Sequence, residues 1–187
     1  YVYPYNVCGL TNNLYNFSPV YNLTTPVGTL TLTACDALQA VIKVIPGQAE
    51  IGGAQYSTLS NAINAIATCG ITQPTIIELA GSYSSSTQVT LPIISGASTI
   101  NTITIRPELN HAGFTLQSTI VSPALTLSSA SYWIVDGRPG GQGFSSAIII
   151  KNTYNGAGPA ISFASSSTAL GSHDNTIKYT KILSNNN

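Results

Sequence analysis

Apolar residues recur in short alternating runs along most of this chain. From Thr75 onward, these runs are separated by Gly, Ser, Asn or Pro. Alternation of apolar and polar positions over a few residues is typical of a half-buried strand, and the separating residues are turn formers. The pattern therefore predicts nine short strands. They lie at 76–79, 89–91, 102–105, 114–116, 124–127, 132–135, 147–150, 160–163 and 176–179.

One segment has helical rather than strand periodicity. Within residues 57–69, four apolar residues fall on one face, and these are Leu59, Ala62, Ile63 and Ile66. Ser57 is a candidate N-cap, and Gly70 ends the pattern. We expect one amphipathic helix that covers an apolar surface left open by the strands.

The first fifty residues have a different character. They are rich in aromatic residues and Pro, and residues 29–33 (TLTLT) predict a strand with one apolar face. Residues 36–45 fit either a strand or a short helix, and Pro46-Gly47 breaks the pattern. We therefore divide the chain into a β-rich extension or assembly arm at 1–50 and a main domain at 51–187. Two N-glycosylation sequons, at Asn16 and Asn22, carry little weight in so Asn- and Thr-rich a chain.

The spacing of the strands favours a parallel β-helix. Ile103, Leu125 and Ile148 are 22–23 residues apart, which predicts that they occupy corresponding positions in successive coils. A β-sandwich also contains many short strands. It would need tight hairpin turns between paired runs, and Asp136-Gly137 is the only candidate for one.

The amino-acid composition indicates where the protein is located. Charged residues make up only 6% of the 187 residues, and Ser, Thr and Asn take their place on the surface. This suits an extracellular strand protein. The net charge of zero argues against nucleic-acid binding, which requires a basic surface. No apolar run is long enough to span a membrane. The chain begins at Tyr1 without a leader, so we expect a processed secreted protein or an excised piece.

The three cysteines predict one disulfide. We expect Cys8 to pair with Cys35 and to close the N-terminal region, with Cys69 buried as a small apolar residue. Three free thiols in a reducing compartment are the alternative. No Cys or His spacing resembles a metal site, and no cofactor motif is found. The Gly-rich run 137–143 lacks the ending of a phosphate-binding loop and no helix pattern follows it, so we interpret it as a broad turn.

The segment 132–141 (YWIVDGRPGG) holds the best candidate site residues. Polysaccharide lyases and hydrolases need clustered carboxylates, and only Asp136 with Arg138 forms a local charged pair here. We interpret this pair as an ion pair that stiffens a turn. Trp133 alternates with apolar neighbours, which favours a core position over a sugar-binding one. Trp133, Asp136 and Arg138 are retained as a candidate ligand site, with no catalytic residue assigned. His173 and Asp174 are interpreted as a solvated loop pair.

Several segments in order resemble a known group of proteins. The chain resembles secreted surface proteins of Bacteroidota with a right-handed parallel β-helix of the pectate-lyase-like superfamily, often exported by the type IX system. The resemblance implies stacked coils and a helix that caps the first coil, which residues 57–69 match. It does not imply catalysis, and residues 1–50 lie outside it. The segments are 56–66, 70–83, 91–107, 132–141, 147–153 and 175–179.

We therefore expect an extracellular structural or adhesive protein. Open strand edges recruit partners, so the last coil is expected to be covered by further chain or by an identical subunit. Joining end to end, or by a strand donated from residues 1–50, would give a filament. The alternative is a module that binds or degrades cell-surface polysaccharide, with a groove lined by Trp133, Asp136 and Arg138.

Overall fold

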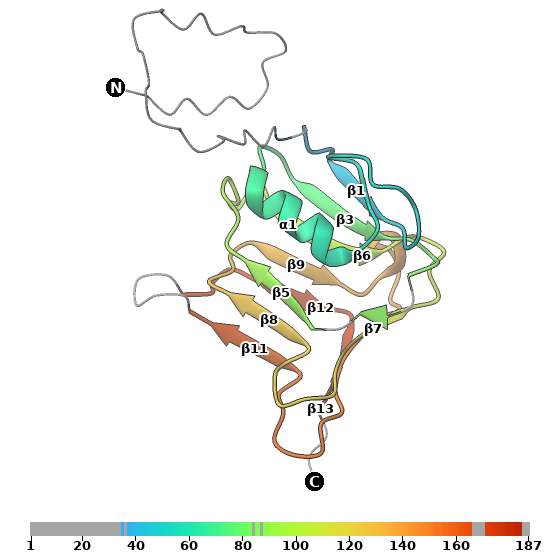
Figure 1. The fold of residues 1–187 in the computed structure, drawn as a ribbon, viewed down its shortest axis with the longest axis vertical. Coiled ribbons are helices and arrows are strands. Elements are labelled where there is room, and N and C mark those ends of the chain that lie inside the picture. Colours follow the sequence, from blue (N-terminus) through green and yellow to red (C-terminus); the bar gives the residue numbers. More distant parts are fainter. Residues whose placement is uncertain (1–34, 36, 84, 87, 166–170, 185–187) are drawn as a thin grey trace, which may run out of the picture.

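The fold was obtained as a computed structural model that describes residues 35, 37–83, 85–86, 88–165 and 171–184. Cys8, both sequons and the predicted strand at 29–33 lie outside these residues. All pairing between the strands of the three sheets is parallel, and the chain winds into a parallel β-solenoid of about four turns (Figure 1). The β-sandwich alternative is therefore wrong.

Three parallel sheets form the walls of the solenoid. The first sheet holds β1 (Val41–Val44), β2 (Gln55–Tyr56), β3 (Thr75–Leu79), β6 (Ile103–Pro107), β9 (Trp133–Asp136) and β12 (Thr176–Lys178). The second holds β4 (Ser85–Ser86), β7 (Phe114–Ser118), β10 (Ile148–Asn152) and β13 (Thr180–Ser184). The third holds β5 (Val89–Pro92), β8 (Leu125–Ser128) and β11 (Ile161–Ala164).

Each full turn uses one strand from every sheet, so the repeat is longer than the sequence suggested. Thr75 pairs with Ile103, 28 residues on, and Ile134 pairs with Thr176, 42 residues on. Ile103, Leu125 and Ile148 lie in three different sheets. The predicted period of 22–23 residues is therefore wrong. It is the spacing between every second strand, since β7 lies between Ile103 and Leu125 and β9 lies between Leu125 and Ile148. The strands of all three walls have the same alternating pattern, so the sequence did not distinguish them.

Inward-facing side chains stack in columns along the solenoid. In the first sheet, Ile77 pairs with Ile105, and Ile105 with Val135. In the second, Leu116 pairs with Ile150. These side chains are all buried. Because parallel strands lie about 4.8 Å apart, each column is a continuous line of aliphatic contacts that stabilises the fold.

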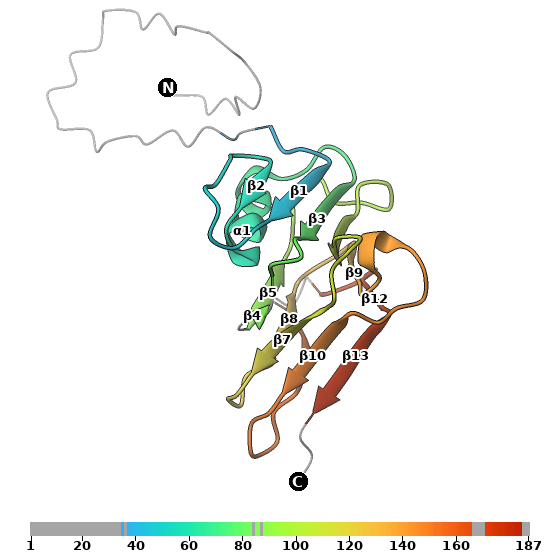
Figure 2. The ribbon, with the colours of Figure 1, turned by 90° about the vertical axis from the view of Figure 1, so that its right-hand side faces the viewer.

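A single α-helix closes the first turn. Helix α1 (Leu59–Cys69) buries Leu59, Ala62, Ile63 and Ile66, the four residues of its predicted apolar face. The N-cap is Thr58 rather than Ser57, because the Thr58 hydroxyl accepts a hydrogen bond from the Asn61 backbone N–H at 3.1 Å. Gly70 ends the helix with φ of 69°, a conformation that favours glycine. The helix lies at the opposite end of the solenoid from β13 (Figure 2).

The ambiguous segment 36–45 contains a strand. Strand β1 pairs with β3 and extends the first sheet, so the sheet begins before the boundary expected at residue 51. Strand β2 pairs with β1 at the outer edge. Residues 41–56 therefore continue the solenoid wall beside the capping helix.

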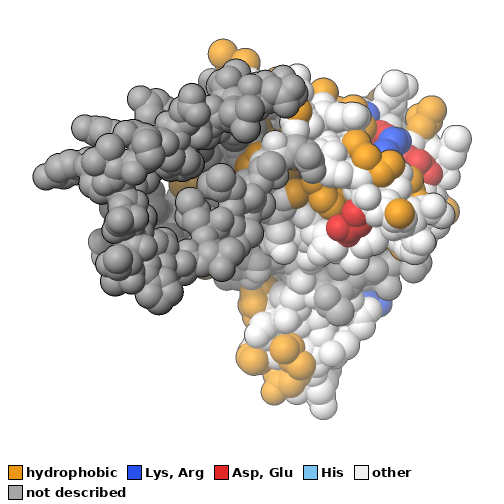
Figure 3. Space-filling view, turned by 45° about the horizontal axis from the view of Figure 1, so that its top comes forward, with side chains coloured by type: hydrophobic (Ala, Val, Ile, Leu, Met, Phe, Trp, Pro, Cys, Tyr) orange, Lys and Arg blue, Asp and Glu red, His pale blue; other side chains and the backbone are white. Residues whose placement is uncertain are grey.

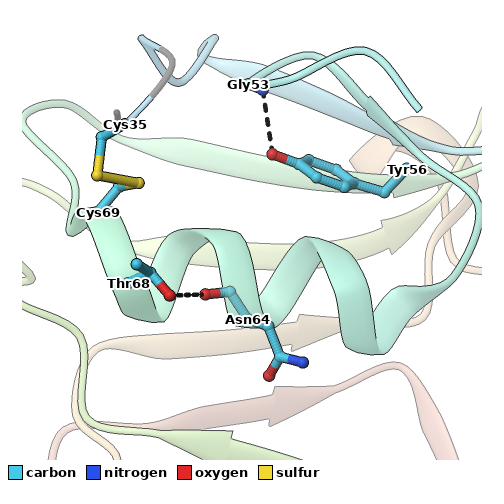
Figure 4. The surroundings of a disulfide bond; sticks show 6 residues. All are labelled: Cys35, Gly53, Tyr56, Asn64, Thr68 and Cys69. Atoms are coloured by element: carbon cyan, nitrogen blue, oxygen red, sulfur yellow. Dashed lines mark hydrogen bonds between the residues drawn. A yellow bond between two sulfur atoms is a disulfide. The ribbon is translucent and has the colours of Figure 1, made fainter. Parts of the chain in front are cut away.

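The disulfide links Cys35 with Cys69, whose Cα atoms are 5.5 Å apart (Figure 4). The predicted pairing of Cys8 with Cys35 is therefore wrong. The prediction that Cys69 is unpaired and buried is also wrong, because Cys69 is disulfide-bonded and half-buried. Sequence spacing could not show that the chain before β1 runs past the C-terminal end of α1. The bond fastens residue 35 to the capped end of the solenoid.

Candidate functional site

Charged side chains of the described residues gather along the first sheet. Strand pairing places Lys43 beside Glu78 and Glu78 beside Arg106. Since Ile105 pairs with Val135, the next residues on these two strands are Arg106 and Asp136. Asp136 in turn pairs with Lys178. We call these five residues, Lys43, Glu78, Arg106, Asp136 and Lys178, the charge ladder. The charges of the ladder alternate in sign from strand to strand, so each side chain lies beside one of opposite charge on the neighbouring strand.

Glu78 occupies the upper part of the ladder. Its carboxylate accepts hydrogen bonds from Lys43 and from Arg106, with the Arg106 Nε at 3.0 Å. Only 10% of the Glu78 side chain is exposed. Burial raises the pKa of the Glu78 carboxyl, but the hydrogen bonds and charges of Lys43 and Arg106 outweigh it and hold that pKa below its ordinary value. Glu78 is therefore an ionised, fully paired carboxylate at neutral pH.

Asp136 occupies the lower part. Arg138 forms a forked pair with it, with Nε 2.9 Å from Oδ1 and Nη2 2.7 Å from Oδ2. Lys178 Nζ lies 3.4 Å from the same Oδ2. Burial raises the pKa of Asp136, but the Arg138 hydrogen bonds and the Lys178 charge outweigh it, and the pKa lies below its usual range. The same hydrogen bond raises the pKa of Arg138. The predicted pair is present, and it also bridges two turns of the solenoid through Lys178.

The turn after β9 covers the ladder. The 3₁₀ turn η1 (Pro139–Gly141) follows Arg138, and a Cβ atom on Gly141 would meet the Arg106 guanidinium at 2.9 Å. The Arg138 guanidinium lies over the ring of Tyr179, 4.5 Å from its centre. The Gly-rich run is thus a turn, as expected, and the absence of a Cβ at Gly141 leaves space for Arg106. Acidic and basic side chains lie next to one another at the right of Figure 3.

Trp133 lies in the core and not in a groove. Its side chain is fully buried, and its indole Nε1–H donates to the Pro92 carbonyl oxygen at 2.8 Å. This satisfies the only polar group of the indole. The Trp133 ring therefore has no surface available to a ligand, and the core interpretation of the alternating pattern is the one that agrees with its position.

The two carboxylates of the ladder, Glu78 and Asp136, do not have the arrangement of a catalytic acid–base pair. Glycoside hydrolysis uses one carboxylic acid with a raised pKa and a second carboxylate facing it. Here the pKa values of Glu78 and Asp136 are both lowered. The strand that carries Arg106 separates the two carboxylates. Within the described ranges, no group of three or more His, Cys, Asp or Glu side chains is placed to hold a metal ion.

His173 and Asp174 form the pair predicted from their adjacency. His173 Nδ1 lies 2.8 Å from Asp174 Oδ2, and both side chains are more than half exposed. The pair lies in the loop before β12. It is a solvated loop pair, and screening by water keeps its contribution to stability small.

A second candidate site is the C-terminal end of the solenoid, where each sheet has its last strand. Phe163 pairs with Leu127 and Ile182 pairs with Ile150, so both continue inward-facing columns. Leu127 and Ile150 are fully buried, whereas Phe163 is 62% exposed and Ile182 is 53% exposed. The strands β11, β12 and β13 are each the last of their sheet, with a strand partner on one side only in the part of the chain that the structure describes. We call these three strands the open end.

Comparison with known proteins adds no relative. No family model, no curated protein and no solved structure matches this chain. Among the described residues, no helix is long and apolar enough to cross a membrane. The resemblance to secreted surface proteins of Bacteroidota stays a prediction, and the function has to be argued from the ladder and the open end.

The ladder was missed in the sequence because its members are far apart along the chain. Each ladder residue directly follows an inward-facing Ile or Val of its strand, as in Ile42-Lys43 and Val135-Asp136. That recurring position was the available signal. Using it required the wall assignment of each strand, which the alternating pattern does not provide.

Proposed function

We propose that this chain is a non-catalytic structural or adhesive module of an extracellular protein, and that it associates through its open end. The observation that carries the proposal is the exposure of Phe163 and Ile182, whose partners on the preceding strands, Leu127 and Ile150, are fully buried. Such positions gain free energy when a further layer of strands covers them, at about 25 cal/mol per Å² of apolar surface. The partner is an identical subunit or further chain of the same protein.

The free strand edges support the same proposal. At the open end, backbone N–H and C=O groups on one side of β11 and β13 face no further strand among the described residues. Proteins that remain monomeric protect such edges with charges, Pro or a covering segment. Strand β13 carries one Lys beside Ile182 and Leu183, and both apolar side chains are more than half exposed. This edge is suited to strand addition.

An extracellular setting is supported by the disulfide and by the composition. Disulfides persist in oxidising compartments, and Cys35 and Cys69 are placed to form one. A surface of Ser, Thr and Asn with few charges is in keeping with that setting. We also propose, from the resemblance of roughly residues 50–187, that the protein belongs with the secreted β-helix surface proteins of Bacteroidota. This would make the solenoid a spacer or an adhesive stalk.

The polysaccharide alternative is less well supported. It relied on Trp133 to stack against a sugar, and that ring is inside the core. Asp136 and Arg138 are engaged with each other and with Lys178. A sugar would have to displace these ion pairs to bind there.

The proposal is tested by measuring the mass of the full chain by light scattering over a range of concentrations. We expect wild-type protein to associate and Ile182→Lys and Phe163→Lys to remain monomeric, because a lysine ammonium cannot be buried unpaired. Ile100→Lys is the matched control, since Ile100 is 78% exposed and lies before β6, outside the open end. Thermal unfolding checks that all variants fold. A monomeric wild-type chain, or association unchanged by both open-end variants, would refute the proposal.

A further inference from the structure

Strand β13 has the longest free edge at the open end to which another strand could be added. It comprises five residues, more than β11 or β12, and its residues 181–184 are all exposed. Thr180 continues the column of Phe114 and Ile148, and Ile182 continues that of Leu116 and Ile150. A fifth strand on this sheet would have to present two apolar side chains, two residues apart, above Thr180 and Ile182.

Residues 29–33 meet that requirement by sequence. They read Thr-Leu-Thr-Leu-Thr, so a strand formed by them has Leu30 and Leu32 on one face and threonines on the other. The segment has the same length as β13 and carries no charge. Thr is favoured in strands, and its hydroxyl suits the outer surface of the solenoid.

The disulfide prevents these residues from reaching β13 of their own molecule. Cys35 is bonded to Cys69 at the C-terminal end of α1, on the capped end of the solenoid (Figure 4). Thr33 is two residues from Cys35, a reach of at most about 7 Å. From β4, the first strand of the sheet that holds β13, to β13 is three strand spacings, or about 14 Å. All five residues would have to lie beyond that distance, so the strand cannot be donated within one chain.

Building on the function proposed above, we propose that residues 29–33 of one copy add to β13 of a second copy as a parallel fifth strand, with Leu30 and Leu32 in the core columns. Each copy then donates from its capped end and accepts at its open end. The contact joins two different surfaces, at opposite ends of the solenoid, so its repetition produces a linear, head-to-tail polymer. It also explains how a module with a helix over one end can be extended, since the donated strand covers β13 without removing α1.

The first test compares two double variants of the full chain by light scattering. Leu30→Lys/Leu32→Lys places charges on the core face and is expected to weaken association by roughly 30-fold or more, as for truncation of an interface hot spot. Thr31→Lys/Thr33→Lys carries the same added charge on the solvent face and is expected to associate like wild type. If the leucine variant associates normally while Ile182→Lys does not, strand donation is overturned and association through the open end stands. If wild type is monomeric, both proposals fail.

The second test traps the contact between copies. Two differently tagged chains, both with Cys8→Ser, carry either Leu32→Cys or Ile182→Cys, and they are mixed and oxidised. We expect a disulfide that joins the two tags. Leu32→Cys mixed with Gln117→Cys is the control, because β7 has a strand partner on both sides and Gln117 is not at the open end. Equal cross-linking to position 117, or none to position 182, would contradict the proposal.

Discussion

The carbonyl oxygen of Tyr179 lies 1.7 Å from the position that a Cβ atom would take on Gly137. No side chain fits in that space. The Gly137 N–H donates to the Lys178 carbonyl at 3.0 Å, and the Ala147 N–H donates to the Gly137 carbonyl at 2.8 Å. Gly137 therefore ends β9 directly against the corner between β12 and β13. The glycine of the Asp-Gly pair is required by the stacking of turns, not by a hairpin.

Gly137→Ala should destabilise the fold because the fourth turn would have to move away from the third. Overpacking of this kind costs about 1–3 kcal/mol in the free energy of unfolding, and chemical denaturation measures it. Gly171→Ala is the control, since a Cβ there meets nothing within 4 Å, and we expect a change within about 0.5 kcal/mol. Equal stability of both variants would show that the two turns are not in close contact at Gly137.

Acid should weaken the fold through Glu78 and Asp136. The pKa values of both carboxyls are lowered in the folded protein. Their stabilising contribution is therefore present above the unfolded pKa values of about 4 and is lost as the pH falls through the lower folded values. The free energy of unfolding, measured between pH 7 and 2, should decrease below about pH 4. Glu78→Gln and Asp136→Asn should each make that decrease shallower, whereas Asp174→Asn, in an exposed loop pair, should not.

Asp136→Asn should also lower stability at neutral pH. It removes the anion that holds Arg138 and Lys178 together. Loss of hydrogen bonds between charged groups in a partly buried site costs roughly 1–3 kcal/mol. Urea unfolding of Asp136→Asn, of Arg138→Gln and of the double variant measures the coupling between the two residues. If the effects of the two substitutions on the free energy of unfolding are additive, the Asp136–Arg138 ion pair does not stabilise the turn.

Reduction of the disulfide should destabilise the capped end. The bond joins residues 34 apart in sequence, and closing a loop of that size stabilises a protein by about 3–4 kcal/mol in the chain-entropy model. Cys35→Ser/Cys69→Ser should lose a similar amount, and Cys8→Ser should lose little. Peptide mapping under oxidising conditions should recover Cys35 linked to Cys69. A peptide with Cys8 linked to Cys35 would contradict this pairing at the capped end.

Trp133 provides a spectroscopic check on the core, because it is the only tryptophan of the chain. A buried indole should emit at short wavelength and resist quenching by iodide. Trp133→Phe leaves the Pro92 carbonyl without its donor and should cost about 1–3 kcal/mol in stability. Oligosaccharides should leave the emission of wild-type protein unchanged. A saturable change on addition of sugar would support the polysaccharide alternative instead.

Local features of this fold can be predicted from the sequence. The nine predicted strands are marked by alternation, the helix by its apolar face and by Gly70, and the Asp136–Arg138 pair by adjacency, whereas β13 was not predicted. Each of these features depends on residues that are close together in the sequence, within or directly beside a single helix or strand. The same local alternation favoured a buried position for Trp133, which the structure shows.

Features that depend on which strands are neighbours could not be predicted. The three walls share one alternating pattern, so Ile103, Leu125 and Ile148 looked equivalent although they lie in different sheets. The partners of Glu78 are 28 and 35 residues away in sequence. The pairing of Cys35 with Cys69 depends on where the chain passes α1. These three features depend on how the chain winds. The turns differ in length, so the winding cannot be recognised from a regular repeat in the sequence.

Association at the open end is tested most directly by hydrogen exchange at β13. We expect the amides of Thr180–Ser184 that do not bond to β10 to exchange rapidly in dilute protein and to become protected as the concentration rises. In Ile182→Lys they should exchange rapidly at every concentration. Exchange in wild-type β13 that is the same in dilute and concentrated solution would contradict association through the open end.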